Sequence, residues 1–324
     1  MCCALIRYSN YMRQPKHRKQ NKMKCLTLLI VIIFSFMTNT VIAEAQVWKV
    51  SDNVYSYGNP NLGYFSMFVV TNEGVVVIES INSVHSKAML GAIKNITNKP
   101  VRYLLQSHNH WDHSKGGKVF REQGAKIVAH SEAVEWMKEN SHDDLVLPDV
   151  VWSGKQKNIV LGDTVIELHY LGMNHGLGMT TFLLPKEKIV YIADIVTPNR
   201  LLFSIADFNF REWTRTLIAL EKMDFQKTIF SHSHAKSPIG SKLEVIQTRE
   251  FIEDLQKEII AEFTKGTSFY AIPNTLKLPK YEKWDFYKEW LPINVWAMMF
   301  QMEMGSFPWR STPMTDETKS KDSQ

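Results

Sequence analysis

The stretch Gln106-Ser-His-Asn-His-Trp-Asp-His113 places four metal-capable side chains, His108, His110, Asp112 and His113, within six residues. The apolar run of residues 101–106 predicts a short buried strand, so the four side chains lie where a strand leads into a loop. In an extended chain, side chains two residues apart point the same way, so His108 and His110 can bind one ion together. Asp112 and His113 are then expected to turn toward a second ion. Imidazole and carboxylate without thiolate indicate an open, catalytic zinc site rather than a closed structural one.

Four side chains cannot fill two metal shells, and three later segments supply candidates at the ends of predicted strands. His175 follows the strand-like residues 164–170 in a glycine-rich loop, where the backbone can approach an ion closely, and it is expected to bind the first ion. An apolar run ends in Asp194, which is placed to bridge two cations. Another apolar run ends in His232 and His234, and one of these two histidines is expected to complete the second shell.

In the order His-x-His-x-Asp-His, His, Asp, His, the whole set resembles the metallo-β-lactamase superfamily. The resemblance covers residues 46–265, in which residues 54–57 and 68–80 look like the opening strands of that family. It implies an α/β fold, the four-layer αββα sandwich, with two zinc ions per chain. The resemblance assigns the first ion to His108, His110 and His175, the second to Asp112, His113 and His232, and the bridging position to Asp194.

The sequence departs from the family pattern at two places. The last family motif usually reads Gly-His-Gly, and Ser231-His232-Ser233 fits that frame with serines, so His232 is preferred and His234 is the alternative ligand. Members usually carry aspartate at the position of Glu79, where the longer side chain is expected to orient a ligand. His130, which follows another predicted strand, is a further candidate for orienting a ligand.

The resemblance also distinguishes the β-lactamases proper from the other enzymes of the family. The β-lactamases proper generally carry cysteine or serine at the position of Asp194, whereas thioesterases of the glyoxalase II type and many other hydrolases carry the bridging aspartate. We therefore expect a metal-dependent hydrolase that uses metal-bound hydroxide on an ester, thioester, lactone or amide-type substrate, with Asp112 as the catalytic base. The alternatives are β-lactam hydrolysis and a non-haem iron dioxygenase of the same fold, with iron in place of zinc.

Charge is distributed unevenly along the chain. The 324 residues carry a formal charge of +5, but residues 1–43 contain seven lysines and arginines and no acidic residue, which leaves 31 basic against 33 acidic residues in the remainder. The remainder therefore gives no support for a nucleic-acid partner. We expect a small-molecule substrate instead.

The first 43 residues read as a secretory signal peptide. Lys22-Met-Lys24 precedes an apolar run of residues 25–34, and Ala43-Glu-Ala45 offers small residues for cleavage after Ala43 or Ala45. An uncleaved membrane anchor is the alternative. All three cysteines, Cys2, Cys3 and Cys25, lie in this segment. The sequence thus predicts a periplasmic or secreted protein. After cleavage, the mature chain is expected to contain no cysteine and to have no stable membrane insertion.

Helical periodicity predicts helices at residues 83–96, 114–123, 131–140, 211–223 and 241–265. Residues 266–310 form a Trp/Met-rich segment that is predicted to be a helical extension packing on the domain. Alternatively this extension forms a lid over the metal cleft or a homo-oligomer interface, and either role would imply a substrate with an apolar part. The polar residues 311–324 are expected to be a flexible tail.

Overall fold

Two mixed β-sheets pack face to face in the computed structural model, which describes residues 45–203, 208–235 and 237–305. The first sheet follows chain order from β1 to β7 and is antiparallel up to β4 and parallel from β4 onward. Its strands are β1 (Gln46–Lys49), β2 (Val54–Asn59), β3 (Tyr64–Val70), β4 (Val75–Ile78), β5 (Val101–Leu105), β6 (Lys126–His130) and β7 (Val150–Trp152).

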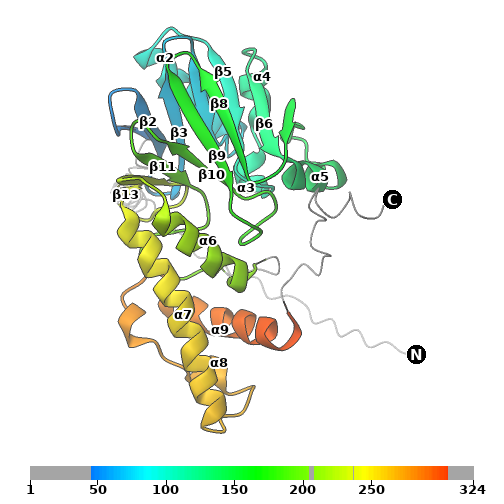
Figure 1. Ribbon diagram of the computed structural model, residues 1–324, viewed down its shortest axis with the longest axis vertical. Coiled ribbons are helices and arrows are strands. Elements are labelled where there is room, and N and C mark those ends of the chain that lie inside the picture. Colours follow the sequence, from blue (N-terminus) through cyan, green and yellow to red (C-terminus); the bar gives the residue numbers. More distant parts are fainter. Residues whose placement is uncertain (1–44, 204–207, 236, 306–324) are drawn as a thin grey trace, which may run out of the picture. The chain divides into compact units, whose positions relative to one another are not determined.

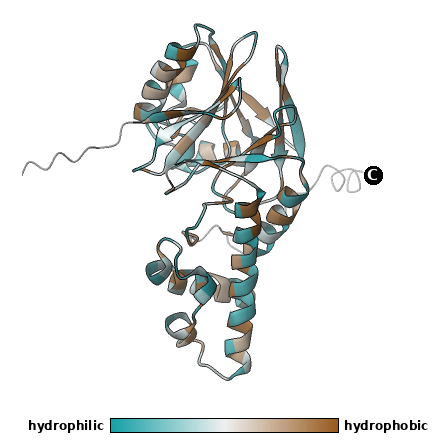
Figure 2. Cartoon of the chain, turned by 90° about the vertical axis from the view of Figure 1, so that its left-hand side faces the viewer, coloured by the Kyte–Doolittle hydropathy of each residue, from teal (hydrophilic) through white to brown (hydrophobic). Residues whose placement is uncertain are grey.

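The second sheet has the order β13-β12-β11-β10-β9-β8, in which only the β11 and β12 pair is parallel. Its strands are β8 (Gln156–Leu161), β9 (Thr164–Tyr170), β10 (Thr180–Leu184), β11 (Ile189–Ile192), β12 (Lys227–Phe230) and β13 (Ile239–Gly240). Brown, apolar stretches run along the strands of both sheets in Figure 2.

Strand β4 shows why the sheets lie between layers of helices. All four of its residues are buried, and they alternate between two apolar clusters. Val76 and Ile78 belong to the cluster between the sheets, whereas Val75 and Val77 pack with Met89 of a covering helix. A strand buried on both faces requires apolar residues at every position, which explains its unbroken valine run.

Helices cover the outer faces of both sheets (Figure 1), which gives the expected αββα sandwich. The first sheet is covered by α2 (Ser83–Ile96) and α4 (Gly117–Arg121), with α3 (Trp111–Ser114) and α5 (Ser131–Glu139) beside them, and the second by α6 (Phe210–Lys222) and α7 (Lys242–Thr264). Four of the five predicted helices agree with the structure within one residue at each end.

The predicted helix 114–123 is wrong as one continuous helix, because the chain forms α3 and α4 with a break at Lys115 and Gly116. Gly116 has a φ of +82°, and a Cβ atom there would lie 2.3 Å from the backbone of Asn82. Only glycine combines this left-handed backbone with so close an approach.

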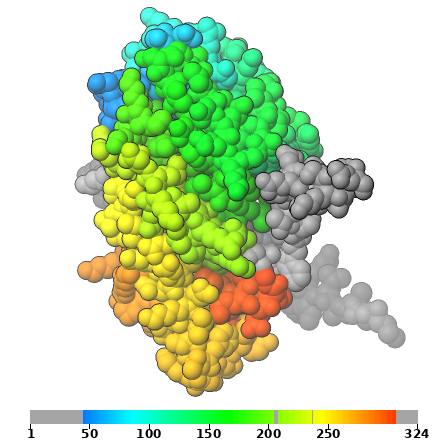
Figure 3. Space-filling model, viewed as in Figure 1, coloured from blue at the N-terminus to red at the C-terminus, as the bar shows by residue number. Residues whose placement is uncertain are grey.

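The C-terminal segment contains α8 (Ile272–Thr275), the 3-10 helix η1 (Pro279–Tyr281) and α9 (Tyr287–Met304). These elements lie beside α7 (Figures 1 and 3). Two side-chain amides of α9 contact the chain before α6 and the first residue of α6. Buried Asn294 Nδ2 donates to the Leu202 carbonyl at 2.7 Å, and half-buried Gln301 Oε1 accepts from Phe210 N at 2.9 Å. The C-terminal helix is therefore held to the sandwich by specific polar contacts as well as by apolar packing.

Several predictions fall outside the described residues. They are the signal peptide at 1–43, the tail at 311–324 and residues 306–310 of the predicted extension. Among the helices of the described ranges, none combines the length and the apolar character needed to cross a bilayer.

Candidate metal centre

The carboxyl ends of neighbouring strands bring the candidate ligands together. β4 and β5 are parallel neighbours, as are β11 and β12, so the loops that follow each pair leave their sheet at one edge. His108 and His110 follow β5, Asp194 follows β11, and His232 follows β12. His175 lies in the loop between β9 and β10, which is joined to the His108 loop because Leu177 N donates to Asn109 Oδ1 at 2.8 Å.

Helix α3 begins directly after His110. This turn of the backbone separates the four clustered side chains into two pairs, His108 with His110 and Asp112 with His113. His108 and His110 join His175 and Asp194 in one group, whose potential ligand atoms all lie within 4.8 Å of one another. Asp112, His113 and His232 form a second group within the same limit. All seven predicted residues thus lie in one place, and a third set within the same limit, Glu79, His108 and His113, overlaps both groups. Their assignment to two ions stays a prediction.

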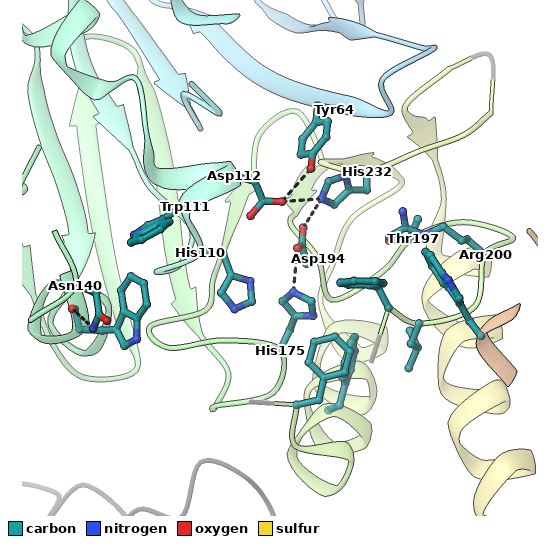
Figure 4. A pocket seen from close by; sticks show the side chains of 16 residues that line it. Tyr64, His110, Trp111, Asp112, Asn140, His175, Asp194, Thr197, Arg200 and His232 are labelled. Atoms are coloured by element: carbon teal, nitrogen blue, oxygen red, sulfur yellow. Dashed lines mark hydrogen bonds and ion pairs between the residues drawn. The ribbon is translucent and has the colours of Figure 1, made fainter. Parts of the chain in front are cut away.

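Asp194 lies between the two groups and offers one oxygen to each (Figure 4). Its Oδ2 atom is 2.9 Å from His175 Nε2 and 3.9 Å from His108 Nε2. Its Oδ1 atom is 3.1 Å from His113 Nε2 and 3.2 Å from His232 Nε2. This is the geometry expected of a carboxylate that bridges two cations.

Hydrogen bonds behind the rings fix which imidazole nitrogen faces the centre. His113 Nδ1 donates to Glu79 Oε2 at 2.9 Å, and His232 Nδ1 donates to the Gly63 carbonyl at 3.1 Å. Their Nε2 atoms converge at 3.1 Å, where two lone pairs would repel, so a proton or a metal ion must lie against them. His108 Nε2 is buried with no hydrogen-bond partner among the described residues. These donor atoms fit a pair of divalent metal ions.

The charges of the cluster also favour a cation. Burial opposes protonation of His113, but the carboxylates of Asp194, Glu79 and Asp112 outweigh it and raise the pKa of His113 well above its ordinary value. Burial and the neighbouring histidines hold the pKa of His108 well below its ordinary range. For Asp194, burial is outweighed by His113 and His232, so its pKa lies well below normal. The centre thus offers ionised carboxylates and a neutral His108, and a metal ion would have to displace the proton from His113, because a ligand histidine must be neutral.

Glu79 is fully buried behind the ligands and has a left-handed backbone with φ of 63°. Its Oε2 atom accepts from His113 Nδ1 at 2.9 Å and from the Tyr191 hydroxyl at 2.7 Å, and its Oε1 atom accepts from the Ser107 hydroxyl. Ser107 Oγ in turn accepts from His108 Nδ1 at 2.7 Å. One carboxylate therefore orients a histidine of each group.

The two remaining predicted residues lie outside both groups. His234 Nε2 accepts from Arg200 Nη1 at 3.1 Å, so its lone pair is directed to Arg200. His130 does not contact any predicted ligand: its ring stacks on Tyr170 with centroids 4.3 Å apart, and its Nε2 donates to the Gly154 carbonyl at 3.2 Å. His130 therefore supports the end of β9, from which the His175 loop departs.

A cavity of about 580 Å³ opens over both groups. Figure 4 shows Trp111 and Asn140 on one side of the histidines and Thr197 and Arg200 on the other. Its aromatic lining consists of Tyr64, Trp111, Trp136, Phe203, Phe208, Trp213 and Trp290. Trp290 belongs to α9, so the C-terminal segment contributes directly to the wall of the cavity.

Sequence reasoning missed three polar residues of this site, Tyr64, Ser107 and Arg200. Ser107 directly precedes His108, and this position beside a predicted ligand is the one sequence signal that could have indicated its role. Tyr64 opens β3, and its hydroxyl donates to Asp112 Oδ2 at 3.1 Å across 48 positions of sequence. No local pattern distinguishes such a residue from other strand tyrosines.

Replacing Tyr64 with phenylalanine tests this contact. Burial, followed by the charge of Asp112, raises the pKa of Tyr64 to about 12, so the phenol stays protonated as a donor at neutral pH. Removing it should lower metal affinity or turnover by roughly three- to tenfold, because a hydrogen bond to a charged group is lost. Metal titration of the variant measures the first effect. Tyr55→Phe is the matched control, because the Tyr55 hydroxyl donates to the Asp52 carbonyl at the surface.

Comparison with known proteins agrees with this geometry. The family model of the metallo-beta-lactamase superfamily matches residues 60–234. The alpha subunit of 2,4-dinitroanisole O-demethylase from Nocardioides sp. (strain JS1661) is 26% identical over 183 residues, which are 55% of this chain and 53% of that protein. Metallo-beta-lactamase IND-1 of Chryseobacterium indologenes is 22% identical over 191 residues, which are 58% of this chain and 78% of that protein. The chain thus spans about half the length of the first of these relatives.

Solved structures show the same fold at low identity. A metallo-beta-lactamase from Pontibacter korlensis has a TM-score of 0.58 and 21% identity, covering 65% of this chain and 100% of its own. The sec-alkylsulfatase Pisa1 from Pseudomonas sp. has a TM-score of 0.66 and 16% identity, covering 81% of this chain and 50% of its own. Together with a family match over more than half of the sequence and two ligand groups joined by one aspartate, this establishes that the chain belongs to the metallo-beta-lactamase superfamily.

Proposed function

We propose that the chain is a binuclear zinc-dependent hydrolase of small molecules with an ester, thioester, lactone or amide-type bond. The observation that carries the proposal is the position of Asp194, whose two oxygens face two separate histidine pairs. When bound, two divalent cations make water acidic enough to react near neutral pH and polarise the substrate's electrophilic oxygen.

The chain's own residues divide the remaining work. Asp112 is half-exposed at the cavity, and Tyr64 orients it by donating to Oδ2, so Asp112 is the carboxylate placed to accept a proton from water. His113, His108 and His232 hold their positions through hydrogen bonds to Glu79, Ser107 and the Gly63 carbonyl, respectively. The aromatic walls exclude water from an apolar part of the substrate.

Two other activities compete with this proposal. The likeness to enzymes called metallo-beta-lactamases supports β-lactam hydrolysis, and the same ligand set is compatible with iron and dioxygen chemistry. Asp194 occupies the position at which the β-lactamases proper use cysteine or serine. It therefore favours hydrolysis of an ester, thioester or lactone over hydrolysis of a β-lactam.

Metal analysis of the protein purified without added metal, beside a substrate panel, separates these activities. The proposal expects about two zinc ions per chain and turnover of an ester, thioester or lactone. Copurified iron with oxygen uptake would favour the dioxygenase. Turnover of a chromogenic cephalosporin alone would favour the β-lactamase.

We also propose export to the periplasm or the exterior and, through the Trp/Met-rich segment, association into a homo-oligomer. The basic and apolar pattern of residues 1–43 supports export. Exposed Ile293, Phe300 and Met304 on α9 support a contact between copies. Amino-terminal sequencing of the protein from its own cells tests cleavage after Ala43 or Ala45, and light scattering of the purified protein tests association.

A further inference from the structure

Ser231 is a fully buried residue directly after β12, and its hydroxyl contacts the centre. The Oγ atom of Ser231 donates to Asp194 Oδ1 at 3.0 Å. The parallel pairing of β11 with β12 brings the two residues together, because Ile192 pairs with Phe230 and the residues that follow leave the sheet side by side. Glycine, the usual residue of the family pattern at this position, has no side-chain atom that could donate to the carboxylate.

The backbone of Ser231 is fixed by strands of both sheets. Ser231 N donates to the Ile192 carbonyl of β11 at 3.1 Å, and Phe65 N of β3 donates to the Ser231 carbonyl at 2.8 Å. A serine side chain can place its oxygen only in a few staggered positions on a backbone held in this way. The fold itself therefore holds the hydroxyl beside Asp194.

The hydrogen bond from Ser231 selects one orientation of the Asp194 carboxylate. Oδ1 lies 3.1 Å from His113 Nε2 and 3.2 Å from His232 Nε2, whereas Oδ2 lies 2.9 Å from His175 Nε2. The terminal torsion of an aspartate is soft, and its rotation would turn both oxygens away from the two groups. A charge-assisted bond to Oδ1 opposes this rotation. Because a carboxylate oxygen has more than one lone pair, Oδ1 can accept the bond and still face a cation.

The Tyr191 hydroxyl is also a hydrogen-bond partner of Ser231. Burial, followed by the charge of Glu79, raises the pKa of Tyr191 well above its ordinary value, so the phenol stays neutral. A carboxylate is a stronger acceptor than a neutral phenol, and the proton of Ser231 is therefore directed to Asp194.

We propose that Ser231 is a positioning residue for the bridging ligand, and that its hydroxyl holds Asp194 Oδ1 toward His113 and His232. The inference rests on the proposed function, since it concerns the two ions that Asp194 would join. Its effect should fall mainly on the ion of the second group, because Oδ1 is the oxygen that faces this group.

Ser233 provides a matched control on the other side of His232. It is the second serine of the same frame and is also fully buried. Its hydroxyl donates to the Ser237 carbonyl at 3.3 Å and accepts from Ala235 N at 3.2 Å, so it stabilises the turn that follows His232. Ser233→Ala therefore removes the same group, at the same burial, without touching the Asp194 contact.

Competition between the zinc-loaded protein and a chromophoric chelator measures the affinity of each ion. Ser231→Ala should weaken one of the two ions by about tenfold or more and the other by less than about threefold, because a group that orients a metal ligand is lost. Ser233→Ala should leave both affinities within about twofold, since its hydroxyl orients no ligand. Each variant loses a buried hydroxyl, so in excess chelator both should unfold at a lower temperature than the wild type.

A second readout follows ligand geometry rather than stability. The visible absorption of the cobalt-loaded protein depends on the arrangement of ligands around the ion, so it should change in Ser231→Ala and stay unchanged in Ser233→Ala. Equal losses of zinc affinity in the two variants, with equal cobalt spectra, would show that Ser231 acts only through folding and would overturn the inference.

A double-mutant cycle tests whether Ser231 acts through Asp194. Zinc titration of Asp194→Ala, at concentrations that fill the remaining ligands, gives the reference affinity. Adding Ser231→Ala to this variant should change the affinity by less than about twofold, since the carboxylate that the hydroxyl holds is already gone. A tenfold loss in both backgrounds would overturn the inference.

Turnover separates this inference from the proposed function. Weaker zinc binding in Ser231→Ala, with no hydrolysis of any substrate by the wild type, would overturn the hydrolase and leave the role of Ser231. Hydrolysis by the wild type, with unchanged zinc affinity in Ser231→Ala, would overturn the inference and leave the hydrolase.

Discussion

Asp194→Asn should reduce the metal content of the purified protein from about two ions to one or fewer and lower turnover by about a thousandfold, because both ions lose a shared ligand. Asparagine has nearly the same shape as aspartate but offers one carbonyl oxygen and an amide nitrogen that cannot bind a cation. Whichever way the amide turns, either the pair His108 and His175 or the pair His113 and His232 loses its carboxylate oxygen.

Metal analysis by mass spectrometry, followed by turnover at saturating substrate, measures both effects of this change. Asp224→Asn is the matched control, because Asp224 is exposed and pairs with Lys188 at the surface, where ion pairs contribute little. If Asp194→Asn kept two ions and its activity, the carboxylate would not bridge the centre, and the proposed function would lose its main support.

Glu79→Gln should weaken metal binding by about 10- to 100-fold, as expected when a group that orients metal ligands is replaced. The carboxylate accepts from His113, Tyr191 and Ser107, whereas glutamine has only one acceptor oxygen. The glutamine amide N–H would face a hydrogen-bond donor, either on the side of His113 and Tyr191 or on the side of Ser107. The ring of His113, or Ser107 together with His108, would therefore have to move. Either movement disturbs His113 or His108, which are both fully buried.

Competition with a chromophoric chelator measures this loss of affinity for each ion. Glu282→Gln, at an exposed position after η1, is the control that removes the same charge elsewhere. A chelator should lower the unfolding temperature of Glu79→Gln by less than it lowers that of the wild type, because bound metal stabilises the variant less. Wild-type metal affinity in the variant would show that Glu79 does not orient the histidines.

Much of the fold is a local consequence of sequence, and it was predictable for that reason. Strand β4 is apolar at every position because both of its faces are buried, and the αββα fold expected from the family resemblance is confirmed by the family match and the two sheets. Helices α2, α5, α6 and α7 follow from their periodicity. The exception at residues 114–123 arose because Gly116 serves a long-range contact with Asn82 that periodicity does not register.

The sequence by itself determined which side chains could bind metal, because the spacing of His108, His110, Asp112 and His113 and the strand ends before the other candidates are local properties. Their role as ligands stays a prediction that the geometry makes testable. Only the tertiary structure directed His232 into the centre and His234 toward Arg200, since two histidines on one strand end differ only in what packs against them. It also decided that Glu79 serves both groups and that Trp290 reaches the cavity. Those contacts join residues far apart in the chain, and their energies depend on packing that no single segment encodes.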